Sequence, residues 1–179
     1  MIAKNNLLNV EVILKKIPHQ DFLQVADLGC GNFGFLVFPL AHLVGKKGKV
    51  YAVDIIQTAL DEISQRARLE NLPQVETVWS NLEIFGATKI EADKLDAALL
   101  INVLHQADKS IDMLKETIRM IKPGGRLIIV DWNEDHPFGP AASQLISRDK
   151  LKTAISKLKL ELAEEFTPGK SHYGLVFVK

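Results

Sequence analysis

The chain has 179 residues, 47% of them hydrophobic and 25% charged, which is enough apolar content for one globular domain with a full core. Its 22 basic and 22 acidic residues balance, and this disfavours bulk binding to nucleic acid or to an anionic membrane surface. The longest apolar runs fall well short of the roughly 20 residues of a membrane-spanning helix. Because the N-terminus lacks a signal-peptide core and a single cysteine cannot form an internal disulfide, we expect one domain over residues 1–179 and a cytoplasmic location.

Short β-type runs alternate along the chain with longer segments of helical period, the pattern of a parallel sheet covered on both faces. Residues 6–17 carry the first amphipathic helical stripe. We expect strands over 24–28, 49–54, 74–79, 95–101 and 126–131, and helices over 34–44, 57–70 and 108–121. Pro123, Gly124 and Gly125 should end the last of these helices and turn the chain into the next strand.

The C-terminal part predicts a helix over 147–157, with Ser147 as its N-cap, and two further strands over 159–166 and 172–178. Residues 167–171 join these strands, and so short a connection permits only an antiparallel hairpin.

A glycine loop follows the first strand, with Gly29, Gly31 and Gly34 in the run VADLGCGNFGF of residues 25–35. Its glycines let the backbone turn sharply and approach a ligand closely, which indicates a site for a nucleotide-type cofactor. Asp27 lies two positions before the first glycine. A carboxylate there would repel a pyrophosphate but attract the ammonium and sulfonium of S-adenosylmethionine, so the loop favours a cationic cofactor.

A second acid, Asp54, ends the predicted strand over 49–54. An acid at this point, about 20 residues after the glycines, accepts hydrogen bonds from ribose hydroxyls. Dinucleotides and S-adenosylmethionine both use such an acid, so Asp54 indicates adenosine without choosing between them.

Five blocks resemble the class I S-adenosylmethionine-dependent methyltransferases in order and spacing: VADLGCGNFGF, VYAVDI, SNLEIFG, LDAALLINVLHQ and IKPGGRLIIVDW. The C-terminal sequence is similar to that of small prokaryotic enzymes that resemble the quinone-biosynthesis methylases. The resemblance implies an α/β fold, a Rossmann-like seven-stranded, mostly parallel sheet with helices on both faces and an antiparallel C-terminal hairpin. It also offers a lid over the cofactor as a role for residues 1–20, beside simple packing of that segment against the sheet.

The resemblance assigns cofactor contacts to several positions. The methionine end would meet Asp27, Gly29 and Gly31, the ribose Asp54, and the adenine Ile55, Asn81 and the backbone N–H of Leu82. The family more often has aspartate at the position of Asn81, and a helix N-cap is the alternative role for this side chain. Asn102 follows the fourth strand, and open α/β sheets bind ligands outside the carboxyl ends of their strands, so it joins the cofactor loop.

Other residues predicted at the carboxyl ends of the strands are candidates for acting on the molecule that accepts the methyl group. His105, His136 and His172 are the candidate bases, and His105, Trp132 and Tyr173 the candidate substrate contacts. The chain lacks the Asn-Pro-Pro-aromatic run of many enzymes that methylate exocyclic amines of bases, and no metal site is indicated.

The sequence therefore predicts an S-adenosylmethionine-dependent methyltransferase that acts on a small-molecule acceptor. Two alternatives remain open: an NAD-dependent oxidoreductase with the same glycine loop, and a methyltransferase-like subunit that has lost activity and serves as a partner. Nothing in the sequence specifies an oligomeric state.

Overall fold

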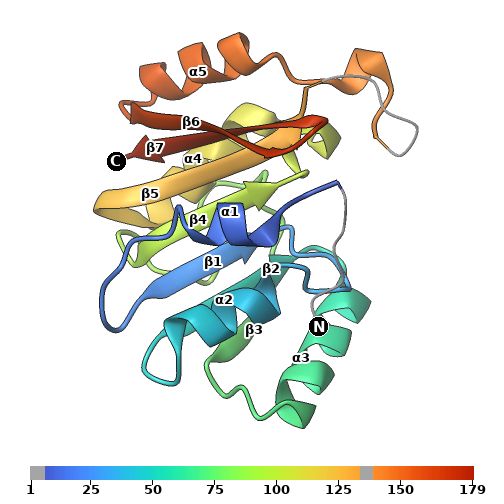
Figure 1. The fold of residues 1–179 in the computed structure, drawn as a ribbon, viewed down its shortest axis with the longest axis vertical. Coiled ribbons are helices and arrows are strands. Elements are labelled where there is room, and N and C mark those ends of the chain that lie inside the picture. The colour runs from blue at the N-terminus through green and yellow to red at the C-terminus, as the bar shows by residue number, and fades with distance from the viewer. Residues whose placement is uncertain (1–6, 134–138) are drawn as a thin grey trace.

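A seven-stranded sheet of order β3-β2-β1-β4-β5-β7-β6 runs through the computed structural model, which describes residues 7–133 and 139–179 (Figure 1). The first five strands pair in parallel: β1 (Gln24–Leu28), β2 (Lys49–Asp54), β3 (Val75–Trp79), β4 (Leu95–Ile101) and β5 (Ile121–Trp132). Strand β7 (His172–Val178) is antiparallel to both of its neighbours, β5 and β6 (Glu161–Gly169). The predicted Rossmann-like sheet with a reversed C-terminal strand is confirmed.

Helices cover both faces of the sheet because the central strands are apolar on both sides. Helices α1 (Val10–Leu14), α2 (Val37–Val44) and α3 (Gln57–Leu69) pack on one face. Helices α4 (Ser110–Met120) and α5 (Arg148–Lys157) pack on the other, and Figure 1 shows α1 and α2 in front of the sheet with α4 behind it. Two 3₁₀ turns, η1 (Leu104–Gln106) and η2 (Ala142–Gln144), follow β4 and β5.

Several predicted boundaries were wrong, among them the start of α2, which is Val37 instead of residue 34. Helix α1 has only five residues, not the whole of 6–17, and Asn9 caps it by accepting from the Val12 N–H at 3.3 Å. Helix α4 ends at Met120, and Ile121 already pairs with Leu95, so the Pro-Gly-Gly segment is an irregular part of β5 instead of a turn before it.

The hairpin connection also differs from the prediction. Strand β6 starts at Glu161, not 159, and continues to Gly169, which pairs with His172. Only residues 170–171 therefore separate the two strands. The pairing extends this far because a register shift between Phe166 and Gly169 absorbs the irregularity around Pro168.

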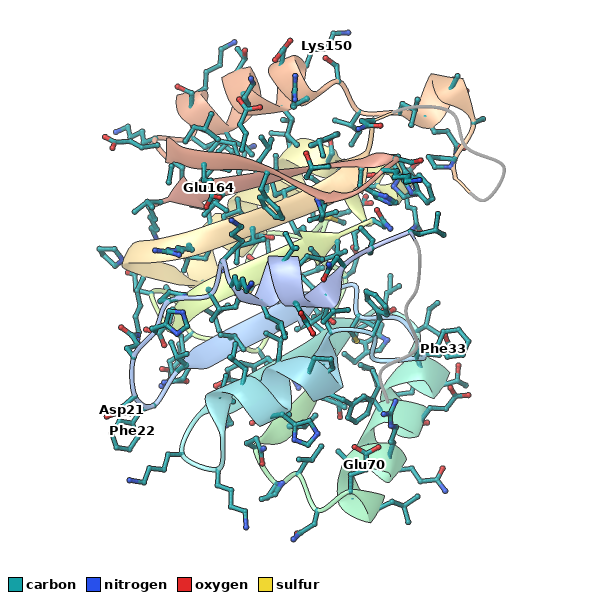
Figure 2. All side chains as sticks on the ribbon, in the orientation of Figure 1. Asp21, Phe22, Phe33, Glu70, Lys150 and Glu164 are labelled. Atoms are coloured by element: carbon teal, nitrogen blue, oxygen red, sulfur yellow. The ribbon has the colours of Figure 1, made fainter. Side chains whose placement is uncertain are left out.

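The carboxyl ends of the parallel strands define one edge of the sheet, and the segments that follow β1, β2, β3, β4 and β5 all start there. Figure 2 shows Phe33 of the glycine loop on this side and Phe22, in the loop before β1, on the opposite side. Within the described residues, no helix is both long enough and apolar enough to cross a membrane.

Candidate cofactor and acceptor site

The glycine loop after β1 holds its backbone in conformations that other residues rarely adopt. Gly29 and Gly31 have φ angles of +76° and +61°. A Cβ on Gly29 would lie 2.7 Å from Cγ2 of Val103, whereas the space around a Cβ on Gly31 is open to 4 Å. Gly29 is therefore glycine because the segment after β4 packs on it, and Gly31 leaves bare backbone to which a ligand has access.

Asp54 fastens this loop to β2. One carboxylate oxygen accepts the Gly31 N–H at 2.8 Å, and the other accepts the Ile56 N–H at 3.0 Å. Each oxygen of an ionised carboxylate has a second lone pair, so Asp54 keeps acceptor capacity for ribose hydroxyls. Its role in holding the loop was not predicted, because the sequence does not show which backbone groups the carboxylate meets.

Asp27, near the end of β1, is a buried acid without a partner. Only 4% of its surface is exposed, and its carboxylate makes no hydrogen bond or ion pair with the described residues. Burial, aided by the nearby charge of Asp54, raises the pKa of Asp27 to about 7. A buried carboxylate is costly when it is unpaired, and a bound cation would remove that cost.

Asn102, directly after β4, supplies a second acceptor without a partner. Its backbone is fixed, with φ at +57°, its N–H bonded to the Val130 carbonyl at 2.8 Å and its own carbonyl accepting from Gln106 at 2.7 Å. Its side-chain Oδ1 is buried, and no described residue donates a hydrogen bond to it. An orphaned buried acceptor indicates a missing donor.

Asp27 and Asn102 line the same cavity, whose volume is about 410 Å³. The other lining residues are apolar or belong to the glycine loop: Leu8, Gly29, Cys30, Phe33, Phe35, Leu36 and Ile101. A charged acceptor and a neutral one in a single, largely apolar cavity suit an ammonium group, which donates three hydrogen bonds. The residues present thus fit the methionine end of S-adenosylmethionine.

The N-terminal segment reaches this cavity through Leu8. The Asn9 N–H donates to the Pro168 carbonyl at 2.6 Å, and a Cβ on Gly169 would lie 1.8 Å from the Leu7 carbonyl oxygen. Lys16 forms an ion pair with Glu164 of β6. The segment is thus anchored on the β6–β7 hairpin, and its first described residues border the candidate cofactor site.

The candidate adenine contacts follow β2 and β3. Ile55 is 52% exposed at the tip of β2, an unusual position for a bare aliphatic side chain, and its carbonyl accepts from the Trp79 indole at 2.8 Å. The side chain of Leu82 is buried in the core. Asn81 is not a helix N-cap: its Oδ1 accepts the Glu83 N–H at 2.9 Å in a turn that no helix follows.

The candidate acceptor residues divide between the two faces of the sheet. His105 bonds to Asp131 on the face that α4 and α5 cover, with 2.8 Å between Nδ1 and Oδ1. Trp132 and its cross-strand partner His172 alternate to the opposite face, where their rings stack with centroids 4.1 Å apart. His136 lies outside the described residues.

The predicted start of β7 at the carboxyl edge is confirmed, since His172 pairs with Trp132. None of His105, His172 and Tyr173 lines the cavity of Asp27 and Asn102, and a cavity shared by these three residues stays a prediction. Tyr173 packs in the core, and its hydroxyl donates to the Ile146 carbonyl at 3.2 Å. Strand alternation puts His172 on the face opposite Tyr173 and Asp131, the partner of His105.

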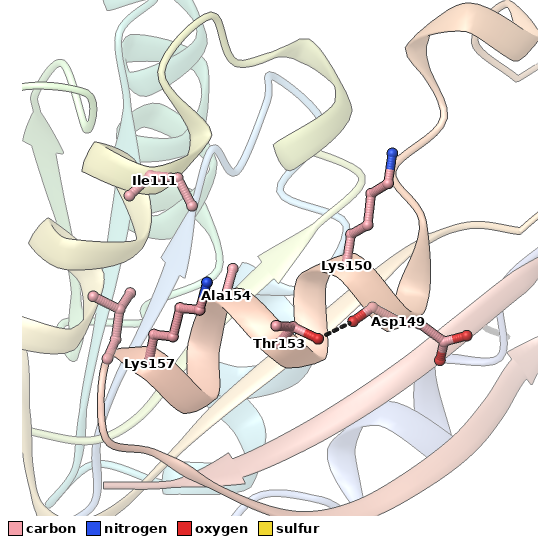
Figure 3. Close-up of a pocket in the computed structure, with 7 residues that line it drawn as sticks. Ile111, Asp149, Lys150, Thr153, Ala154 and Lys157 are labelled. Carbon is pink, nitrogen blue, oxygen red and sulfur yellow. Dashed lines mark hydrogen bonds between the residues drawn. The ribbon is translucent and has the colours of Figure 1, made fainter.

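A second cavity, of about 510 Å³, lies between α4 and α5 (Figure 3). Ile111 lines one side, and Lys150, Ala154 and Lys157 of α5 lie on the other. The Thr153 hydroxyl there donates to the Asp149 carbonyl at 2.9 Å, within the helix itself. This groove is on the face of the sheet opposite the cavity of Asp27.

A family model described as a methyltransferase domain matches residues 19–174. The chain belongs to this methyltransferase family. Among curated proteins, the domain is 28% identical over 131 residues to the demethylmenaquinone methyltransferase of Lactococcus lactis, covering 73% of this chain and 50% of that one. It is 32% identical over 121 residues to the 2-phytyl-1,4-naphtoquinone methyltransferase of Synechococcus elongatus, covering 68% and 50%. The chain thus spans about half the length of these relatives.

Solved structures with the same fold include a SAM-dependent methyltransferase from Aquifex aeolicus, with a TM-score of 0.84, 24% identity, and coverage of 96% of this chain and 90% of that one. The [4+2]-cyclase SpnF also matches, with a TM-score of 0.81, 12% identity, and coverage of 95% and 80%. At these identities the likeness shows the fold of the methyltransferase domain.

Proposed function

We propose that this methyltransferase domain binds S-adenosylmethionine and transfers its methyl group to a small-molecule acceptor. The observation that carries the proposal is a pair of acceptors, Asp27 and Asn102, that share one cavity beside the glycine loop and receive no hydrogen bond from the described residues. A cationic amino-acid end satisfies both, whereas the pyrophosphate of a dinucleotide would bring negative charge to a buried carboxylate.

In this proposal, different residues of the site contact different parts of the cofactor. Asp27 and Asn102 hold the ammonium, and bare backbone at Gly29 and Gly31 allows close approach. Asp54 accepts from the ribose, and Ile55 covers the adenine, with Asn81 and the Leu82 N–H at its edge. The cofactor supplies an already activated methyl group on a sulfonium, so the chain contributes mainly by positioning donor and acceptor.

The residues proposed to act on the methyl acceptor come from the same edge of the sheet, where the parallel strands end. His105, His136 and His172 are the candidate bases, and Trp132 and Tyr173 the candidate substrate contacts. A quinone-like small molecule is the acceptor class we favour, since two of the similar proteins are named for naphthoquinone substrates.

Calorimetry with S-adenosylmethionine, S-adenosylhomocysteine and NADH tests the assignment. We expect binding of the first two and none of NADH, and D27N should weaken the binding of S-adenosylhomocysteine at least tenfold. Binding of NADH alone would identify an oxidoreductase instead. A domain that binds S-adenosylhomocysteine but forms none from S-adenosylmethionine, with naphthoquinols or other small hydroxylated aromatics as acceptors, would be the inactive partner subunit.

A further inference from the structure

We propose that Asp131 is a positioning residue that holds His105 in its Nδ1–H tautomer, which leaves Nε2 as a base for an acceptor that carries a removable proton. This inference rests on the proposed function for its chemistry and on the described contacts for its geometry.

The described residues that bond to the Asp131 carboxylate do so through nitrogen. It is 1% exposed at the end of β5, where Oδ1 lies 2.8 Å from His105 Nδ1 and accepts the Trp132 N–H at 2.9 Å. Its Oδ2 accepts the backbone N–H of His105 at 3.3 Å. An ionised carboxylate is purely an acceptor, and both of its oxygens are met by backbone donors, so the proton between the two side chains belongs to Nδ1.

The tautomer follows from that hydrogen bond. In a neutral imidazole one nitrogen carries the proton and the other a lone pair, and a partner that accepts from Nδ1 fixes the lone pair on Nε2. Within the described residues nothing bonds to Nε2, and the side chain of His105 is 10% exposed. The ring is therefore held at Nδ1, while Nε2 has no partner among the described residues.

His105 also lies next to the cavity of Asp27 and Asn102 along the chain. It belongs to η1, which begins two residues after Asn102, and Val103 between them packs against Gly29. His105, the partner of Asp131, thus lies on the segment that forms a wall of the candidate cofactor site. Ring position and loop position are set together, because Asp131 bonds both the side chain and the backbone N–H of His105.

Tyr173 does not compete with His105 as a base. Burial and the charge of Asp131 raise the pKa of Tyr173 well above its usual value, against the opposing charge of Arg148. Its hydroxyl stays protonated and donates to Ile146.

The proposed step is balanced with an acceptor that carries a hydroxyl or another acidic proton. The bond from the acceptor atom to its proton breaks, and that proton forms a bond with Nε2. The electron pair left on the acceptor atom bonds to the methyl carbon, while the sulfur keeps the pair of the methyl–sulfur bond. The positive charge moves from sulfur to the imidazole, where the Asp131 carboxylate stabilises it, and the proton later leaves to water.

Nitrogen NMR tests the tautomer without any acceptor. In ¹⁵N-labelled wild type at about pH 8.5, where an ordinary histidine is neutral, we expect the His105 signals of a protonated Nδ1 and an unprotonated Nε2. The spectrum of H105Q assigns those signals, and His19 and His42 serve as internal references. In D131N the amide can donate to Nδ1 as well as accept from it, so the His105 signals should move towards the Nε2–H form.

Two results would overturn the inference: an Nε2–H tautomer in the wild type, or unchanged His105 signals in D131N. The wild-type spectrum needs no variant, so it decides the tautomer even if D131N does not fold. S-adenosylhomocysteine titration distinguishes the failure of this inference from the failure of the proposed function. Equal affinity in wild type and D131N would show that the substitution changes His105 without changing the cofactor site. A wild type that does not bind S-adenosylhomocysteine would refute the proposed function, and the tautomer result would still stand.

Discussion

The Asp27 carboxylate and the Asn102 side-chain oxygen line one cavity from two neighbouring strands, β1 and β4, and no described residue donates to either. The parallel pairing of these strands brings the two acceptors together, because the glycine loop and the segment after β4 leave the sheet at the same edge. Because burial raises the pKa of Asp27 to about 7, the site is sensitive to pH.

The affinity for S-adenosylhomocysteine should rise with pH up to about 7 and then level off. Asp27 has a pKa of about 7 in the free domain, and a bound ammonium favours its charged form, so below this pH binding must release a proton. We expect a loss of up to tenfold in affinity per pH unit below 7 by isothermal calorimetry. D27N should show weak binding without this slope, and an equally steep slope in D27N would assign it to another group.

D27N should also stabilise the free domain. The raised pKa of Asp27 means that its favourable contribution is complete below the unfolded pKa of about 4 and is lost as pH rises through about 7. At pH 8 and without ligand, we expect D27N to raise the free energy of unfolding by up to about 4 kcal/mol. Urea denaturation of D27N and wild type at pH 4 and pH 8 measures the difference in the free energy of unfolding. No increase in D27N at pH 8 would show that water or an ion already stabilises the charged carboxylate in the wild type.

Asp54→Ala should weaken cofactor binding by about 1 to 3 kcal/mol through lost hydrogen bonds to the ribose. Because Asp54 also holds the N–H groups of Gly31 and Ile56, we further expect faster amide exchange in the glycine loop. Asp54→Asn keeps an acceptor and should show a smaller effect on exchange. An unchanged dissociation constant in Asp54→Ala would remove this residue from the site.

Glu116→Gln should destabilise the domain by about 3 kcal/mol or more, because it leaves a partly buried Arg119 without its counter-charge. Burial raises the pKa of Glu116, but hydrogen bonds from Arg119 and from the N–H groups of Gly86 and Thr88 outweigh burial and hold it at about 2. This stability is present above the unfolded pKa and is lost as pH falls from about 4.5 towards 2.

The exposed Asp112–Lys115 pair on the same helix is the matched control for Glu116. D112N should change the free energy of unfolding by less than about 1 kcal/mol. Equal effects of the two substitutions in urea denaturation would mean that the Glu116 contacts do not hold the segment between β3 and β4.

Gly169→Ala should displace residues 7–9, since its Cβ would collide with the Leu7 carbonyl. Leu8 lines the cofactor cavity, so we expect about tenfold weaker binding of S-adenosylhomocysteine and faster tryptic cleavage at Lys15 and Lys16. Lys170→Ala, at the exposed next position, is the control. Wild-type affinity despite faster cleavage would show that the segment packs on the hairpin without acting as a lid.

The fold was predictable because its strongest signals are local. Alternating apolar runs placed all seven strands, and the short link before His172 required the reversal. Boundaries were missed where long-range pairing overrode turn chemistry, as at Gly124, whose N–H bonds to the Lys179 carbonyl instead of closing a local turn.

The candidate site was predictable in its edge position but not in its contacts. Asp27 and Asn102 follow from strand ends and glycine spacing. Asp131 as a partner of His105 does not, because the hydrogen bond depends on which face each side chain takes and on the path of η1. The same alternation puts His105 and His172 on different faces of the sheet, and their convergence on one acceptor stays a prediction.

The position of β7 in the sheet determines when the sheet can be completed during translation. Of the seven strands β7 is the last to be translated, yet it lies between β5 and β6 and is the partner of both. Until residues 172–178 leave the ribosome, the edge of β5 away from β4 is open and β6 has no neighbour in the sheet. A nascent chain stalled before His172 therefore exposes strand edges on which other chains can aggregate, and chaperone contact should concentrate in that interval.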